Sequence, residues 1–598
     1  IQINVSPYNL RDAGFTGASI NAVTKSGTNT IHGTGFYNQR NEGYLGKKAG
    51  IGGKQDVVTT AFDVKQYGAS FGGAIIKNKL FYFVNYEVER RNDIGSTWVA
   101  DASNGATPVS GNISKVKKSE LEDLSTFLQT KLNYNPGGYQ GYPFVTKSDK
   151  AVVRFDWNIN DKHKLSVRGN MLTSKRDVGA SNSNSTNGSR GNSNVSMMFQ
   201  NSAYEINNNI YGVIAQLNSR FSNKINNELT FGYTANRDFR GVKGGSFPMV
   251  DIQDGSSPLT ATPTAPGSSV PSAQAGQSRT YISFGNDPFT PNNLLNTDTW
   301  QFNDNLTAYL GKHTLTAGVS FESMTFTNGF TALINGIYTF NNLNDFYTAA
   351  NAFIASPSQS FSPVFMRNYR ASFSNLPGGV PWLVKTKARN IAAYIQDELN
   401  LEPNFNLTYG IRFEVPYFSG AGFTNTEVDG MSFIDNNGQS TKLSTSKLPT
   451  AKLMISPRIG FNYDVKGDRT TQIRGGVGMF TGRPPFVFVS NKMGNNGVLS
   501  GFVSLNNTAA YPFTTNTPAS YPSFAPNPGV PASSYNFATT EESFRFPKVL
   551  RSNLAVDQKV YQDIIFTGEL IYTQSLNNIN YYNANLRPSS KFFAGPDT

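Results

Sequence analysis

Cysteine is absent from this sequence of 598 residues, and histidine occurs only three times. The lack of cysteine excludes disulfides, thiolate metal sites and cysteine nucleophiles. The histidines, His32, His163 and His313, show no spacing typical of metal ligands, so we expect neither a metal site nor a cofactor. Charged residues make up only 15% of the chain, and no apolar run approaches the roughly 18 residues of a membrane-spanning helix.

Aromatic residues and glycine, in contrast, are abundant. Aromatic residues account for 13% of the chain and there are 55 glycines, which favours strands and turns over helical bundles. The net charge is +12, but lysine and arginine form no compact cluster with interleaved aromatic residues. We therefore expect no nucleic-acid partner, and a basic surface that can meet anionic lipid headgroups.

Apolar and polar residues alternate with the period of a β-strand in many segments. In "FNLTYGIRFE", residues 405–414, one face carries only apolar residues while the other carries Asn406, Thr408, Arg412 and Glu414. The same alternation occurs in residues 164–171, 228–234 and 457–465. These segments predict an all-β fold with one apolar and one polar face on each strand.

Tight turns join these strands into hairpins. We expect turns near residues 77–79, 160–163, 222–224, 310–312, 402–404, 466–468 and 561–563. With one more strand at about residues 31–44, the sequence predicts about fifteen strands. A long polar loop follows each short turn, an asymmetry typical of a transmembrane antiparallel β-barrel and unlike a soluble sandwich.

The long loops differ in composition. Residues 118–132 have leucines at helical spacing and acidic residues in the first turn, which predicts an amphipathic helix, and a second helix is expected at residues 343–353. Residues 174–202 are rich in serine, asparagine and glycine and are expected to be mobile. Residues 255–278 are rich in serine, proline and alanine and show no periodicity.

One catalytic pattern occurs. Residues 68–72, "GASFG", match the Gly-X-Ser-X-Gly motif, whose serine requires a strained turn between a strand and a helix. Here the motif lies inside an alternating strand that is followed by a turn and another strand. We therefore expect no hydrolase site and no enzyme.

Two long motifs resemble the TonB-dependent outer-membrane transporters, in particular their Oar-like branch of Bacteroidetes and myxobacteria. Residues 5–47, "VSPYNLRDAGFTGASINAVTKSGTNTIHGTGFYNQRNEGYLGK", resemble the junction between plug and barrel in that family. Residues 66–90, "QYGASFGGAIIKNKLFYFVNYEVER", resemble its second and third barrel strands. The resemblance extends more loosely over most of the chain.

The resemblance implies a barrel of about 22 strands filled by an N-terminal plug. Residues 1–30 would be the end of the plug and its linker. Residues 31–598 would be the transmembrane barrel, with short periplasmic turns and long extracellular loops. The remaining plug, the box that a TonB-type periplasmic energiser pulls, and about seven C-terminal strands are expected outside this sequence.

Two sets of site residues are predicted. The resemblance assigns Gly17, Asn21, Thr24, Lys25 and Gly27 to the closing motif of the plug. Small residues there would let the segment lie close to the barrel wall, and Gly27 could turn the chain into the first strand. Strand alternation also predicts residues that face the lumen, where they would be hydrated, form ion pairs across the lumen or hold the plug. They are Arg154, Asp156, Arg168, Glu228, Arg412, Arg458 and Arg551.

The expected function is active, TonB-dependent import of a large or scarce ligand across the outer membrane of a Gram-negative bacterium. The extracellular loops would capture the ligand, and plug movement would admit it. The alternative is a surface scaffold, adhesin or export-associated barrel whose loops bind partner proteins, and a third option is passive diffusion. Outer-membrane lipid and lipopolysaccharide are expected partners of any such barrel.

Overall fold

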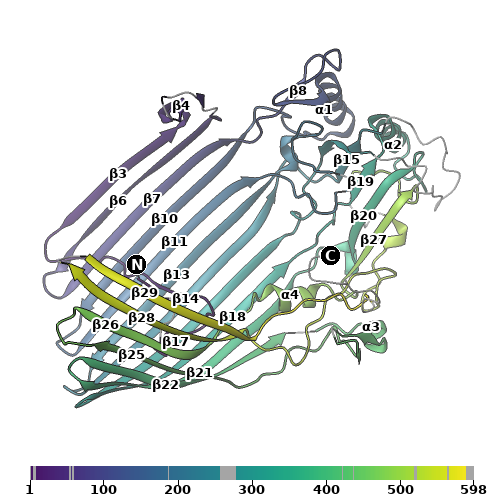
Figure 1. Ribbon diagram of the computed structural model, residues 1–598. Coiled ribbons are helices and arrows are strands. Elements are labelled where there is room, and N and C mark those ends of the chain that lie inside the picture. The colour runs from purple at the N-terminus through teal and green to yellow at the C-terminus, as the bar shows by residue number, and fades with distance from the viewer. Residues whose placement is uncertain are drawn as a thin grey trace.

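One antiparallel sheet of fifteen strands dominates the computed structural model (Figure 1). The structure describes residues 2–4, 8–50, 52, 55–56, 59–185, 188–255, 278–420, 422–435, 437–516, 521–561 and 564–586. Each strand of the sheet pairs with the sheet strands before and after it along the chain, and β3 and β29 form the edges among the described residues. Figure 1 shows a single curved wall. The predicted all-β class and strand number are confirmed.

The strands of this large sheet are β3 (His32–Asn41), β6 (Phe62–Ile76), β7 (Leu80–Ile94), β10 (Pro143–Asn158), β11 (His163–Val178), β13 (Tyr204–Arg220), β14 (Ile225–Val242), β17 (Leu294–Leu310), β18 (His313–Gly329), β21 (Val384–Glu402), β22 (Phe405–Gly420), β25 (Met454–Asp464), β26 (Thr471–Thr481), β28 (Lys548–Tyr561) and β29 (Ile564–Asn577). Each of the seven predicted tight turns joins two adjacent antiparallel strands. Residues 562–563 of the seventh turn lie outside the described part of the chain. The motif at residues 68–72 lies inside β6, as its alternation predicted.

Side-chain burial in the large sheet is the reverse of that in a water-soluble protein. On β22, Phe413 is 39% exposed, whereas its neighbours Arg412 and Glu414 are 4% and 3% exposed. On β25, Ile459 is 43% exposed and Arg458 only 4%. The outer face is therefore apolar and the interior face polar, as expected for a sheet whose outer face contacts lipid.

The long loops fold together at one end of the sheet. A second sheet of six strands is built entirely from loop segments, in the order β12 (Met197–Met198), β16 (Thr280–Phe284), β15 (Met249–Gln253), β19 (Ile337–Phe340), β20 (Met366–Ser374) and β27 (Ser500–Thr508). We call the described residues of the contributing loops, 95–142, 179–203, 243–293, 330–383 and 482–547, the loop module. The six strands come from four of these loops, and residues 95–142 join them through a shared hydrophobic core, so the loop module is one packed body.

Two predicted helices belong to the loop module. They are α1 (Lys118–Leu132) and α2 (Leu343–Ala355), which confirms both helix predictions. Leu121, Leu124 and Leu128 of α1 are fully buried. Asn342 caps α2 by accepting a hydrogen bond from the backbone N–H of Asp345 at 2.9 Å.

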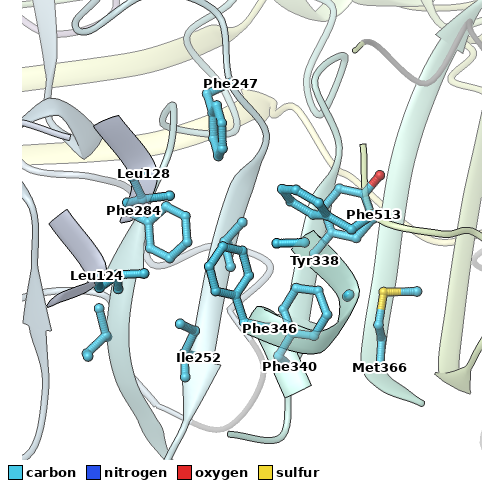
Figure 2. Packing of buried hydrophobic residues seen from close by; sticks show 14 of the residues in the cluster. Leu124, Leu128, Phe247, Ile252, Phe284, Tyr338, Phe340, Phe346, Met366 and Phe513 are labelled. Atoms are coloured by element: carbon cyan, nitrogen blue, oxygen red, sulfur yellow. The ribbon is translucent and has the colours of Figure 1, made fainter. Parts of the chain in front are cut away.

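Aromatic rings form the centre of the loop module (Figure 2). The ring of Phe346 lies 5.1 Å from that of Phe284, 5.6 Å from that of Phe340 and 5.6 Å from that of Phe513, centroid to centroid, in edge-to-face contacts. Phe284, Phe340, Phe346 and Phe513 come from three different loops. The module thus has a hydrophobic core like that of a soluble domain.

The structure corrects the expectation for residues 174–202. Their first five residues belong to β11, and among the described residues after it Arg190 is anchored inside the loop module. Arg190 is fully buried and forms an ion pair of 2.8 Å with the equally buried Asp251. The serine-rich composition gave no sign of this ion pair, because its partner lies 61 residues away. Of residues 255–278, the stretch 256–277 lies outside the described residues.

The other elements are short. They are β1 (Gln2–Asn4), β2 (Ser19–Asn21), η1 (Glu42–Tyr44), β4 (Lys48–Ala49), β5 (Gln55–Asp56), β8 (Val99–Asp101), β9 (Ile113–Lys117), η3 (Gln200–Ser202), η5 (Pro377–Gly379), α3 (Thr426–Gly430), β23 (Phe433–Ile434), β24 (Ser440–Thr441), α4 (Val487–Gly494) and η7 (Pro522–Phe524). In the described part of the chain, no helix has the length and apolar character needed to cross a membrane.

Candidate functional site

The candidate site lies where residues 8–30, here called the N-terminal segment, run along the interior face of the large sheet. Six of the seven predicted lumen-facing residues contact this segment: Arg154, Asp156, Glu228, Arg412, Arg458 and Arg551. The seventh, Arg168, lies directly opposite Arg154 on the neighbouring strand. Strand alternation therefore identified the face that meets the segment.

Four arginines hold the segment by its backbone. Arg458 donates from Nη1 to the carbonyl oxygens of Asn9 and Asp12 at 2.8 and 2.7 Å. Arg551 donates from Nη2 to the carbonyl oxygen of Thr16 at 2.6 Å and from Nη1 to that of Gly17. These bonds depend on the path of the backbone and not on the side chains of the segment.

The other two arginines bind the segment at Leu10 and at Thr24. Arg412 donates to the carbonyl oxygen of Leu10 at 3.4 Å. Arg154 donates from Nη1 to both the carbonyl and the hydroxyl oxygen of Thr24, at 2.8 and 2.9 Å. Hydrogen bonds that involve a charged group contribute about 1.5–3 kcal/mol each, so the four arginines together account for a substantial part of the attachment.

Neighbouring groups hold the guanidinium groups in place. The Nε of Arg412 lies 3.2 Å from Glu414, and Arg154 forms an ion pair of 2.8 Å with Asp156. The guanidinium carbon of Arg458 lies 4.4 Å from the centre of the Phe480 ring, a cation–π contact. Phe480 also packs against Phe15 of the segment at 5.9 Å. Contacts with the sheet itself therefore orient these three guanidinium groups.

Glycines on the interior face make room for two side chains of the segment. A Cβ on Gly460 would lie 2.5 Å from the Tyr8 ring, and one on Gly476 would lie 2.6 Å from it. A Cβ on Gly410 would lie 2.6 Å from Leu10, which is fully buried and whose backbone N–H donates to Gln396 Oε1 at 2.7 Å. A larger residue at Gly460 would displace the segment, whereas one at Gly410 or Gly476 would also clash with the backbone of the adjacent strand, at 2.4 Å from a carbonyl oxygen in each case.

Sequence reasoning missed this row of glycines, although the sequence contains a signal for it. Each glycine stands two positions from an arginine on the same strand and therefore on the same face: Gly410 and Arg412, Arg458 and Gly460, Arg474 and Gly476. The pattern combines a small residue with a cation in the lumen. Such a pattern indicates that the glycine leaves space for another chain segment and that the nearby arginine can donate hydrogen bonds to that segment.

The predicted junction residues occupy the rest of the segment. Gly27 must be glycine, because a Cβ there would lie 2.3 Å from the carbonyl oxygen of Tyr82 and 2.4 Å from that of Gly73. Thr24 accepts from Arg154 as described. Around Gly17 there is open space, so it contributes through its carbonyl group and not through its small size.

Two junction residues make fewer contacts. Asn21 lies in β2, pairs with Gln2 of β1 and donates from its side-chain amide to Ser19 Oγ at 3.3 Å. Burial raises the pKa of Asp12, while Arg458 and Asn21 act in the opposite direction. Lys25 is exposed.

Comparisons with known proteins agree with this architecture. A family model described as an outer membrane beta barrel domain matches residues 23–596. No curated protein sequence matches the chain. Among solved structures, the outer membrane transporter YddB from Escherichia coli is similar in fold, with 12% identity and a TM-score of 0.53 over 95% of this chain and 54% of that chain.

Two receptors are also similar. The siderophore receptor PirA from Acinetobacter baumannii has 12% identity and a TM-score of 0.43, over 94% of this chain and 55% of that chain. The ferric-catecholate import receptor Fiu from Escherichia coli K12 has 12% identity and a TM-score of 0.45, over 94% and 60%. The chain spans about half the length of the transporter YddB. At these identities the similarity concerns the fold alone.

Proposed function

Because the chain belongs to the outer membrane beta-barrel domain family and lies in the outer membrane, we propose that it is the barrel of a TonB-dependent transporter that imports a large or scarce ligand. In this proposal, residues 1–30 are the end of a plug. Residues 31–598 are barrel, with short turns in the periplasm and the loop module outside the cell. The motif of residues 5–47 supports placing it in the Oar-like branch.

The observation that carries the proposal is the attachment of the N-terminal segment to the interior face. The arginines bind carbonyl oxygens, which are neutral acceptors, so the segment can leave without stranding a buried carboxylate. A plug that a periplasmic energiser pulls has to be held firmly and yet be released. Hydrogen bonds from cations to the backbone suit both needs.

A first experiment tests the attachment. Residues 1–598 contain no cysteine, so Ser19→Cys places a reactive thiol in the segment, in a full-length protein from which any cysteine elsewhere has been replaced by serine. In this background, Arg458→Gln combined with Arg551→Gln should speed thiol labelling by a water-soluble maleimide by at least roughly tenfold, because the two arginines donate four charge-assisted hydrogen bonds to the segment. Arg168→Gln is the matched control, since no described contact joins Arg168 to the segment, and it should leave the rate unchanged. Equal rates in all three proteins would contradict the attachment.

A second experiment tests transport. Cells that produce the full-length protein are grown in a complex medium, and solutes that disappear from the medium are profiled by mass spectrometry with and without the TonB-type energiser. We expect at least one solute to be depleted only when both proteins are present. Depletion that persists without the energiser would favour passive diffusion.

One observation favours a second function, a surface scaffold or adhesin. The loop module has its own aromatic core and presents a preformed surface, which suits protein binding as well as ligand capture. Pull-down from solubilised membranes separates the two functions. A partner that stays bound without any added solute favours the scaffold, and one whose binding requires a transported solute favours import.

A further inference from the structure

Three cations follow one another along the outer face of β21. Lys385, Lys387 and Arg389 occupy alternate positions, so their side chains share one face. The same face continues with Ile391 and Ile395, which are 50% and 46% exposed. This cation stripe, Lys385, Lys387 and Arg389, thus lies at the loop end of the sheet, directly beside the apolar outer face.

No carboxylate faces the cation stripe from the adjacent strands. On β18 the directly opposed residues are Thr327, Thr325 and Ser323. On β22 they are Ser419 opposite Lys387 and Tyr417 opposite Arg389, whose guanidinium carbon lies 5.6 Å from the Tyr417 ring centre. Within the described residues, no ion pair neutralises these three charges. Five polar residues therefore flank them, four of which offer aliphatic hydroxyl groups.

In another row of four outer-face cations, the protein itself neutralises three. Lys65, Arg90, Lys147 and Lys175 are directly opposed on β6, β7, β10 and β11. Three of them have carboxylate partners: Asp63 is 3.0 Å from Lys65, Asp149 is 3.0 Å from Arg90, and Glu205 is 3.2 Å from Lys175. The contrast is that acids accompany three of these four cations, whereas no acid is directly opposed to the cation stripe on β18 or β22.

The cation stripe lies at one border of the apolar band. Below Arg389 the outward positions of β21 are apolar until Asp397, which accepts from Tyr409 Oη at 2.9 Å. Arg389 and Asp397 are eight positions apart, about 26 Å along the strand and about 20 Å along the membrane normal for a strand tilted by about 40°, which covers most of the roughly 25 Å height of the apolar band of such barrels. Trp300, which is 46% exposed, lies at the same level of the sheet as Arg389, because Ser323 on the strand between them is directly opposite both residues. Aromatic residues mark the interface between acyl chains and headgroups.

We propose that the cation stripe binds the phosphate groups of a phosphorylated lipid of the outer leaflet, whose acyl chains lie on Ile391 and Ile395. Three unneutralised cations match an anionic headgroup, and the flanking hydroxyl groups can donate to phosphate oxygens. The site is continuous with the lipid-facing surface. The proposal rests on the orientation in the proposed function, which places the loop end outside the cell.

The test uses the purified protein in a non-ionic detergent, titrated with bis-phosphorylated lipid A and followed by native mass spectrometry. The triple variant Lys385→Gln, Lys387→Gln, Arg389→Gln should bind at least roughly tenfold more weakly, given the contribution of each cation near an anionic surface. The control is Lys65→Gln with Lys175→Gln, two cations that already have carboxylate partners, and it should stay within about twofold of wild type. Dephosphorylated lipid A should bind the wild type as weakly as lipid A binds the triple variant.

Three outcomes would overturn the proposal: unchanged binding by the triple variant, equal loss in the control, or displacement of lipid A by inorganic phosphate at equal concentration. Circular dichroism checks folding. If the triple variant does not fold, Lys387→Gln alone is compared with Lys175→Gln alone in the same assay. Because binding in detergent requires neither energiser nor solute, a failure of transport would leave this result unaffected.

Discussion

The large sheet and the loop module bury opposite kinds of side chain. Phe346 in the module is fully buried, whereas Phe413 on the sheet is 39% exposed. The difference shows that one chain is folded for two solvents. Water drives the apolar residues of the module into a core, and lipid leaves those of the sheet on the outside.

Arg190 of the loop module and Arg458 and Arg551 of the sheet meet different kinds of partner. In the loop module Arg190 pairs with the carboxylate of Asp251, an arrangement that leaves no net charge in the core. In the sheet, Arg458 and Arg551 bind carbonyl oxygens of the N-terminal segment. A cation that meets a neutral acceptor is held less tightly than one that meets an anion. The first contact is suited to permanent structure and the second to release.

The largest effect is expected from the aromatic core of the loop module. Phe346→Ala should destabilise the module by about 4 kcal/mol, because a cavity remains among three rings. Hydrogen exchange measured by mass spectrometry should show faster exchange of the β15 and β19 amides and unchanged exchange in β22. Phe413→Ala, which removes the same ring from the lipid face, should leave the β15 and β19 amides unaffected. Equal changes in both regions would mean that the module and the sheet unfold together.

The lipid-facing surface of the sheet and the water-facing surface of the loop module can be compared by placing a charged side chain on each. Ile391 on the sheet is 50% exposed and Ile354 on α2 is 42% exposed, so they differ in surroundings more than in exposure. In phospholipid vesicles, Ile391→Arg should destabilise the protein by about 3 kcal/mol in denaturant titrations. Ile354→Arg should change stability by no more than about 0.5 kcal/mol. Similar costs at both positions would contradict a lipid-facing sheet.

A buried lysine in α4 tests whether the loop module has an interior of low polarity. Lys492 is fully buried, and its Nζ has no hydrogen-bond partner in the described part of the chain. Burial lowers its pKa to about 8, against the opposing influence of Glu542 and Asp429. Lys492→Met should therefore stabilise the module by about 1–2 kcal/mol at pH 7.

The pH dependence of this lysine has a defined sign. Because its pKa is lower in the folded protein, the unfolded chain binds more protons between pH 8 and 10.5, so folding stability rises with pH across that window. Local opening of α4, measured by hydrogen exchange, should show this rise in the wild type and not in Lys492→Met. If stability rises with pH by the same amount in both proteins, the titrating group is not Lys492.

The smallest effect is expected at Asp345 in the first turn of α2. Burial raises its pKa to about 6, so its contribution to stability is present below the unfolded pKa and is lost as the pH rises through 6. Asp345→Asn should stabilise α2 by less than about 1 kcal/mol at pH 7.5. It should also make the stability of α2 less dependent on pH between pH 4 and 7. The measurement is the exchange of α2 amides over that range. A steeper dependence in the variant would contradict this account of Asp345.

Much of the sheet could be predicted from the sequence, and less of the site. Tight turns, strand number and the faces of strands such as β22 follow from alternation over a few residues, and helices α1 and α2 follow from leucine spacing and composition. The same alternation placed Arg412, Arg458 and Arg551 on the interior face. The partners of these arginines could not be predicted, because strand periodicity carries no information about a segment hundreds of residues away.

The sequence by itself determined which residues face lipid and which face the interior, since a period of two fixes the side of a strand on which each side chain lies. Only the tertiary structure decided that Arg551 meets Thr16, which is 535 residues distant, and that the loops share one core. The physical reason is the range of each interaction. Alternation is set by neighbours along the chain, whereas the attachment of the segment and the packing of the loops exist only once the curved sheet has brought distant residues together.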